Sequence, residues 1–136
     1  MGKVEMISYD LANGINYDQI ELEKPSWEQI LEIISKLDGK ETTEVSLYAL
    51  EESICLCIGG GNNNLYNVYY SEEYGEKNYT LKKRGGVLFE KHKLITGGQM
   101  GEFEDNICVG KDMVRIVVEY FYIYGCMYKG YVWNIE

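Results

Sequence analysis

The last third of the chain, residues 95–133, constrains the fold most, because it joins a glycine turn, an acidic stretch, a long apolar segment and a late tryptophan. The glycines of "ITGGQMGEFEDNI" interrupt any regular element, and the acids that follow predict an exposed loop. In "GKDMVRIVVEYFYIYG" the apolar residues also alternate as in a strand. However, the polar residues recur every three or four positions and Gly125 closes the segment. This pattern favours a helix over residues 111–124.

A second helix is predicted over residues 26–38. Ser26 is a suitable N-cap, and Gln29 stands three residues later, where a capping-box partner belongs. The apolar residues that follow keep helical spacing up to Gly39.

Short segments rich in β-branched and aromatic residues, separated by turn residues, predict antiparallel strands. We expect these strands at residues 1–10, 43–50, 53–60, 64–71, 77–82, 87–95 and 131–134. Residues 11–24 are expected to form a loop with a short extended piece at 19–22. The predicted fold is therefore a single α+β domain over residues 1–136, with a mainly antiparallel sheet of about five to seven strands packed by the two helices.

The charge balance argues against several classes of partner. The chain has 13 Lys and Arg against 22 Asp and Glu, a formal net charge of −9. Nucleic acids and anionic membrane surfaces are bound through basic residues, so direct binding to either is not expected. The charged beginning, "MGKVEMISYD", does not resemble a signal peptide, and no apolar run approaches the length of a membrane span. A cytoplasmic protein is expected, and its acidity suits either simple solubility or a basic protein partner.

Few groups in the chain suit catalysis, metal or cofactor binding. Cys55 and Cys57 lie two apart in an expected strand and should share one face as small, free thiols, and no zinc-type spacing joins them to Cys108 and Cys126. His92 stands between two lysines and is expected to be an exposed surface residue. The run "GGGNNN" lacks the ending of a phosphate-binding loop and predicts a turn with positive φ angles. We therefore expect no enzyme, metal or cofactor.

Tyrosine is unusually frequent, with 13 of the 18 aromatic residues. Tyrosine combines apolar area with a hydroxyl group and is enriched at protein interfaces, although many tyrosines simply fill a core. The clustered tyrosines are Tyr66, Tyr69, Tyr70, Tyr74 and Tyr79.

Several motifs together resemble the Imm-one family of immunity proteins from bacterial polymorphic toxin systems. They are "CLCIGGGNNNLYNVYYS", "LITGGQMGEFEDNICV", "DMVRIVVEYFYIYG" and the late "VW", which cover roughly the last 80 residues. The resemblance implies an α+β protein that binds and blocks a cognate toxin domain, notably a nucleic-acid deaminase or nuclease, inside the producing cell. Gly97, Gly98, Gly125 and Trp133 then serve as structural markers.

Toxins that act on nucleic acid tend to have basic clefts, so we expect acidic and tyrosine side chains to contact the toxin. The residues predicted to do so are Glu102, Glu104, Asp105, Glu72, Glu73 and Tyr74. The same acids could instead form a solvated turn before the helix. Two other functions stay open: a small-molecule-binding or enzymatic domain with a tyrosine-lined pocket, and a structural adaptor with no toxin partner.

Overall fold

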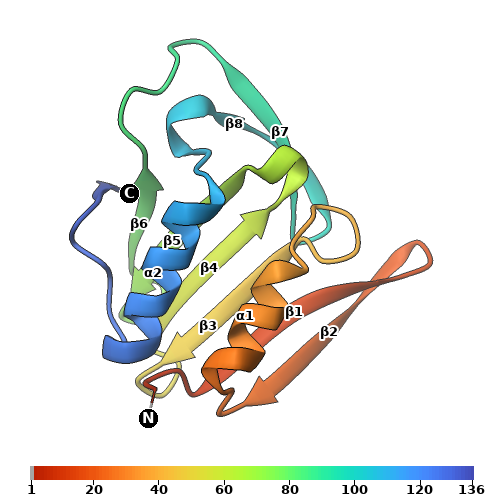
Figure 1. Cartoon of the computed structure of the whole chain (residues 1–136), viewed down its shortest axis with the longest axis vertical. Coiled ribbons are helices and arrows are strands. Elements are labelled where there is room, and N and C mark those ends of the chain that lie inside the picture. The colour runs from red at the N-terminus through yellow and green to blue at the C-terminus, as the bar shows by residue number, and fades with distance from the viewer. Residues whose placement is uncertain (1) are drawn as a thin grey trace.

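The structure is a computed structural model and describes residues 2–136. Its elements are β1 (Met6–Asn13), β2 (Asn16–Glu23), α1 (Trp27–Ser35), β3 (Glu44–Ala49), β4 (Ile54–Gly60), η1 (Asn62–Asn64), β5 (Tyr66–Glu72), β6 (Lys77–Lys82), β7 (Lys91–Thr96), β8 (Gln99–Glu104), η2 (Asp105–Ile107), α2 (Lys111–Tyr124) and β9 (Val132–Ile135). Figure 1 shows both α-helices against one face of a large sheet. The predicted α+β class, with a mainly antiparallel sheet and two helices, is confirmed.

Within residues 2–136 the large sheet has seven strands in the order β2-β1-β3-β4-β5-β6-β9, and β7 pairs with β8 in a separate hairpin. Neighbouring strands of both sheets are antiparallel. Consecutive side chains of a strand point to opposite faces, so alternate apolar residues face the helices and form the core. Leu47, Leu56 and Tyr70 lie side by side in this register and are fully buried.

Helix α1 begins as its capping pattern predicts. The backbone N–H of Gln29 donates to the Ser26 hydroxyl at 3.2 Å, and the backbone N–H of Ser26 donates to the Gln29 side chain at 2.9 Å. The helix ends at Ser35, however, not at 38 as predicted. Asp38 instead organises a turn, because its Oδ1 accepts from the backbone N–H groups of Lys40 and Glu41.

Helix α2 covers the predicted residues 111–124. Val114, Val117, Val118 and Phe121 recur at helical spacing and are buried against the sheet. Gly125 ends the helix in the left-handed region at φ 70°, and its N–H donates to the carbonyl of Phe121 at 2.7 Å. The polar spacing and the closing glycine therefore outweighed the strand-like alternation.

The prediction of a loop at residues 11–24 is wrong, except that the short extended piece expected at 19–22 lies within β2. β1 starts at Met6 and continues to Asn13, and β2 returns from Asn16 as the edge strand of the large sheet. Gly14 supplies the positive φ of 66° that this tight hairpin needs. Most of β2 is exposed, so the strand lacks the apolar alternation by which strands are predicted.

The chain after β6 also differs from the prediction. β7 begins at Lys91 instead of residue 87, and β8 occupies residues expected to form an acidic loop. Gly97 and Gly98 make the tight turn between them, with φ angles of 60° and 77°. A Cβ at Gly98 would lie 3.1 Å from the ring of Tyr17, so the turn packs closely on β2.

The four cysteines are free, as predicted. Cys55 and Cys57 are paired in register with Tyr48 and Ser46 on the sheet face away from the helices. Cys57 is buried and Cys55 is half-buried, and burial raises the pKa of the Cys55 thiol to about 11. Within the described residues, no helix is both long and apolar enough to cross a membrane.

Candidate functional site

The six residues predicted to contact a toxin fall into two separate regions of the structure. Glu72, Glu73 and Tyr74 lie at the end of β5 and in the turn to β6. Glu102 and Glu104 lie on β8, and Asp105 begins η2. β6 leads away from the first region, so the two regions lie toward opposite ends of the large sheet (Figure 1).

The first region, here called the acidic tip, consists of the β3–β4 turn (residues 50–53) and the end and turn of β5–β6 (residues 72–76). In an antiparallel meander every second turn lies at the same end of the strands, which places these two turns side by side. The backbone N–H of Tyr74 donates to the carbonyl of Ser53 at 3.1 Å and joins them directly. Residues far apart in sequence thus form one continuous surface.

Apolar and acidic side chains are exposed together at the acidic tip. Leu50 is 66% exposed and Tyr74 is 75% exposed. Glu51, Glu52, Glu73 and Glu76 are also exposed around them. Lys77, the first residue of β6, has its Nζ 3.5 Å from a Glu73 carboxylate oxygen. Both side chains of that pair are more than half exposed, so the pair leaves the tip strongly acidic.

The backbone of the acidic tip is strained. Leu50, Glu51 and Glu52 have φ angles of 51°, 54° and 67°, and Glu73 and Tyr74 have 54° and 56°. A non-glycine residue in this left-handed region costs roughly 1 kcal/mol or more, and hairpin turns of this kind favour Asn and Gly instead. Such unfavourable choices concentrate at functional sites. The strain therefore marks the acidic tip as a candidate functional surface.

The acidic tip surrounds an open depression of about 640 Å³. Its lining comprises Leu50, Ser53, Ile54, Glu72, Glu73, Tyr74 and Glu76. The apolar side chains of Leu50 and Ile54 contribute to the lining together with three carboxylates. This arrangement suits an apolar group of a partner that carries positive charge beside it.

Glu72 differs from the other acids of the tip, because it is half-buried and accepts a hydrogen bond from a core residue. The hydroxyl of the buried Tyr70 donates to its Oε2 at 2.8 Å. Burial, with the neighbouring Glu72 carboxylate, holds the pKa of Tyr70 well above its usual range. Glu72 thus ties the acidic tip to the core, where Tyr70 packs edge-on against Phe121 and Trp133 at 6.3 Å each.

The second region offers much less free negative charge. Glu102 and Glu104 are exposed on β8, but they stand opposite Lys93 and Lys91 of β7 in the strand register. Opposite charges at such positions partly neutralise each other. The expectation that Asp105 lies in a solvated loop is wrong, because it is only 7% exposed.

Asp105 is held by several donors. Its Oδ2 accepts from the backbone N–H of Val87 at 2.7 Å, and its Oδ1 contacts His92 Nε2 at 2.6 Å and Lys83 Nζ at 3.1 Å. The Val87 hydrogen bond, then those from His92 and Lys83, hold the pKa of Asp105 well below its usual range. We call this arrangement the Asp105 clamp. It fastens the chain between β6 and β7 to the end of β8.

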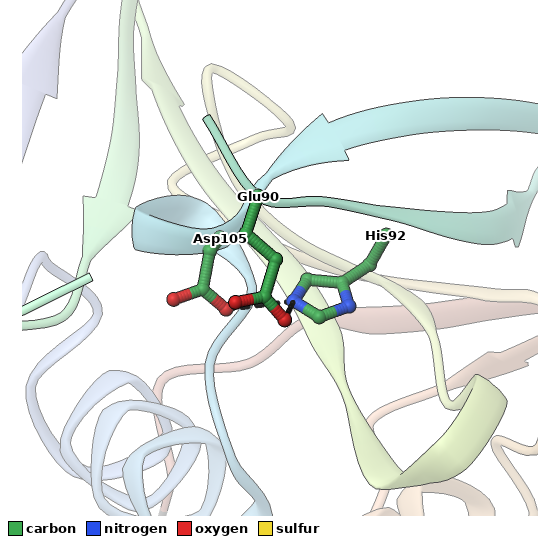
Figure 2. Close-up of side chains that lie close together, drawn as sticks. All are labelled: Glu90, His92 and Asp105. Carbon is green, nitrogen blue, oxygen red and sulfur yellow. Dashed lines mark hydrogen bonds and ion pairs between the residues drawn. The ribbon is translucent and has the colours of Figure 1, made fainter. Parts of the chain in front are cut away.

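His92 is not the exposed residue that the sequence suggested. Its ring is half-buried and points toward Asp105 and Glu90, as Figure 2 shows. Ligand atoms of Glu90, His92 and Asp105 lie within 4.8 Å of one another, a spacing that a metal ion can use. The Lys83 ammonium contacts the same Asp105 oxygen as His92, so that oxygen already has a positively charged partner. The cluster is accounted for as a set of hydrogen bonds and ion pairs.

The clustered tyrosines do not gather around one pocket. Tyr66 and Tyr70 are buried in the core, and Tyr79 packs on Tyr70 at a ring distance of 6.0 Å. Tyr69 points to the opposite face of the sheet, in register with Cys57. Tyr74 stands apart at the acidic tip.

Trp133 closes the core at the edge of the sheet. It is half-buried, and its indole N–H donates to the carbonyl of Tyr128 at 2.8 Å. Its place, like the turn at Gly97 and Gly98 and the cap at Gly125, is structural.

Sequence reasoning missed residues 50–53 as part of the tip and Lys83 as a partner of Asp105. Residues 50–53 could have been found from the predicted meander, because the β3–β4 and β5–β6 turns lie at the same end of the strands. Nothing in the sequence pattern indicated the Asp105 clamp, because His92 and Lys83 lie 13 and 22 residues before Asp105.

Comparisons of this chain with models of protein families and with curated protein sequences found no match.

Proposed function

We propose that this protein is an immunity protein that binds a cognate toxin domain in the cytoplasm of the producing cell and neutralises it without any catalytic step of its own. The observation that carries the proposal is the acidic tip, where exposed Leu50 and Tyr74 stand on strained turns among carboxylates. The motifs that resemble the Imm-one family support the same class of function.

The chemistry of the tip defines the surface it would bind. Four exposed carboxylates, with Glu72 behind them, suit lysine and arginine side chains of a toxin that acts on nucleic acid. Tyr74 and Leu50 would supply the apolar contact area, which typically sets how slowly a complex dissociates. In this proposal the carboxylates occupy the positions where the toxin binds phosphates, so the toxin's nucleic-acid cleft is blocked.

The turns are also fixed before binding. Besides the contact between Tyr74 and Ser53, the Ser53 hydroxyl donates to the carbonyl of Leu50 at 2.6 Å, and the Asn78 side chain donates to the carbonyl of Gly75 at 2.8 Å. A surface that is already ordered loses less conformational entropy on association. This supports tight binding by a small set of residues.

A growth-rescue assay tests the proposal. This chain is co-expressed with the C-terminal domain encoded by the adjacent gene, which should arrest growth when expressed alone. We expect the wild-type chain to restore growth and the tip variant, Glu73→Lys with Glu76→Lys, to fail.

The matched control is Glu28→Lys with Glu119→Lys, which changes the net charge equally at exposed positions on the two helices. It should still restore growth. If the wild-type chain gives no protection, the immunity function is wrong. If the tip variant protects as well as the control does, the acidic tip is not the binding site.

A further inference from the structure

The segment between β6 and β7 exposes an unusual run of apolar side chains, here called the apolar loop (residues 87–89). Val87, Leu88 and Phe89 are 57%, 79% and 93% exposed. Phe89 also has a left-handed φ of 68°, which a bulky residue rarely adopts. Apolar side chains exposed together on a strained turn usually belong to a binding surface, whereas an ordinary solvent-exposed turn is polar.

Hydrogen bonds fix both ends of the apolar loop. The N–H of Val87 donates to Asp105 Oδ2 at 2.7 Å, and the N–H of Glu90 donates to the carbonyl of Val87 at 3.2 Å. The N–H of Asp105 in turn donates to the carbonyl of Glu90 at 2.9 Å. The Asp105 clamp therefore presents the loop in one preformed shape, which suits a pocket of matching shape on a protein better than a fluid lipid surface.

The chain segment around the apolar loop has more cations than acids although the chain as a whole is acidic. Residues 82–93 contain five Lys and Arg and one acid, Glu90, in a chain of net charge −9. Lys83 is paired with Asp105, and Lys91 and Lys93 stand opposite Glu104 and Glu102 in the strand register. Lys82 and Arg84 are the two further cations just before the loop. The loop therefore fits an apolar depression with an acidic rim.

The acidic tip of the same protein has these properties. Its depression is lined by Leu50 and Ile54 together with Glu72, Glu73 and Glu76. β6 runs from the tip at Lys77 to Lys82 just before the apolar loop, so the two surfaces lie at opposite ends of one strand (Figure 1). They cannot meet within one molecule, but a second copy displaced along the strand direction brings them together.

We propose that the apolar loop of one copy docks into the acidic tip of another, so that free protein associates head to tail. Phe89 enters the depression, and the flanking cations face Glu73 and Glu76. Such a contact uses two different surfaces, so a pair of copies still has one free loop and one free tip, and assemblies grow with concentration unless they close into a ring. The contact does not depend on the proposed function. If a basic toxin does bind the tip, it competes with the loop of another copy, and the head-to-tail assembly cannot grow further at that tip.

The test uses the full chain and two complementary variants. Phe89→Asp removes the loop contact but keeps the tip, and the tip variant (Glu73→Lys with Glu76→Lys) does the reverse. Molar mass is measured by sedimentation velocity from about 1 μM to about 1 mM, spanning the affinities typical of weak protein contacts. The wild-type mass should rise above that of the monomer with concentration. Each variant alone should stay monomeric, with at least a ~10-fold weaker association.

The decisive sample is the equimolar mixture of the two variants. One intact loop and one intact tip remain in it, so the mixture should form heterodimers and nothing larger. Ile15→Asp, which changes a 98% exposed side chain in the β1–β2 turn, is the matched control and should associate as the wild type does. Circular dichroism and thermal melting check that every variant is folded.

A wild-type chain that stays monomeric throughout this range overturns the proposal, and so does a monomeric mixture of the two variants. Binding of the monomer to anionic vesicles through Phe89 would likewise overturn it, because the loop's occupant would then be a membrane. Growth rescue by Phe89→Asp separates the two proposals. Its success beside a monomeric wild type leaves the immunity function intact and removes self-association alone.

Discussion

The acidic tip and the Asp105 clamp contain the same kind of residue in opposite circumstances. At the tip, Glu51, Glu52 and Glu76 are exposed on strained turns. In the clamp, Asp105 is buried and bound by a backbone N–H, a histidine and a lysine. A carboxylate whose hydrogen bonds are already satisfied within the fold has little left to offer a partner. The partners and burial of an acidic residue, more than its presence in the sequence, therefore indicate what it does.

The largest effect on stability should come from Asp105→Asn. The amide keeps the size of the side chain but removes the charge that faces Lys83 and His92, and it leaves fewer acceptors for their donors. We expect the melting temperature to fall clearly. Thermal unfolding of Glu104→Gln, one residue earlier and exposed, is the control and should match the wild type within error. Equal melting temperatures for both variants would mean that the clamp contributes nothing to stability.

The largest effect on binding should come from Tyr74→Ala. An exposed aromatic anchor that becomes buried in an interface typically contributes about 2 kcal/mol, so affinity for the toxin domain should fall roughly 30-fold. Titration calorimetry with the purified domain measures this. Tyr124→Ala, which removes a 58% exposed tyrosine at the end of α2, should leave affinity unchanged. The same loss in both variants would indicate a general effect of removing tyrosine and not a hot spot at the tip.

Acid should weaken the clamp in a defined direction. Because the pKa of Asp105 is lower in the folded protein, its contribution to stability is complete above the unfolded pKa of about 4 and is lost as pH falls through the folded value. The stability difference between wild type and Asp105→Asn should therefore shrink as the pH is lowered from about 5 through 4 and below. Melting curves across this range test it, and a difference that widens in acid would contradict the assignment.

The smallest effect should come from neutralising the acids of β8. Glu102 and Glu104 are exposed and stand opposite lysines, so Glu102→Gln with Glu104→Gln should change the unfolding free energy by less than about 0.5 kcal/mol. Toxin affinity should change by no more than about twofold. Chemical denaturation and the same calorimetry measure both quantities. A tenfold loss of affinity would move the binding site toward β8.

The sequence predicted the parts of the fold that follow a strong local pattern. Helix α2 has helical spacing and a closing glycine, and β3 to β6 are short segments rich in β-branched and aromatic residues between clear turns. Strand β2 was predicted only as a short extended piece at 19–22 because it is an edge strand with little to bury. Strand β8 was missed because Gly97 and Gly98 before it and Gly101 within it look like a break in regular structure. In both cases pairing with a neighbouring strand supplies what the local sequence lacks.

Only the part of the candidate site that follows a strong local pattern was predicted from the sequence. Glu73 and Tyr74 follow an obvious strand and end in an exposed turn, as expected. Asp105 looked like another exposed acid because its partners Lys83 and His92 come from elsewhere in the chain. Tertiary contacts of this kind have no period or spacing that a sequence pattern can show.

In the function proposed above, the acidic tip, and not the acidic strand β8, binds a basic toxin. The most direct test measures the affinity of the toxin domain for two charge-matched variants, Glu73→Lys with Glu76→Lys and Glu102→Lys with Glu104→Lys. We expect the tip variant to lose at least about tenfold in affinity, while the β8 variant stays within about threefold of the wild type. Strong loss in the β8 variant with normal binding by the tip variant would contradict it.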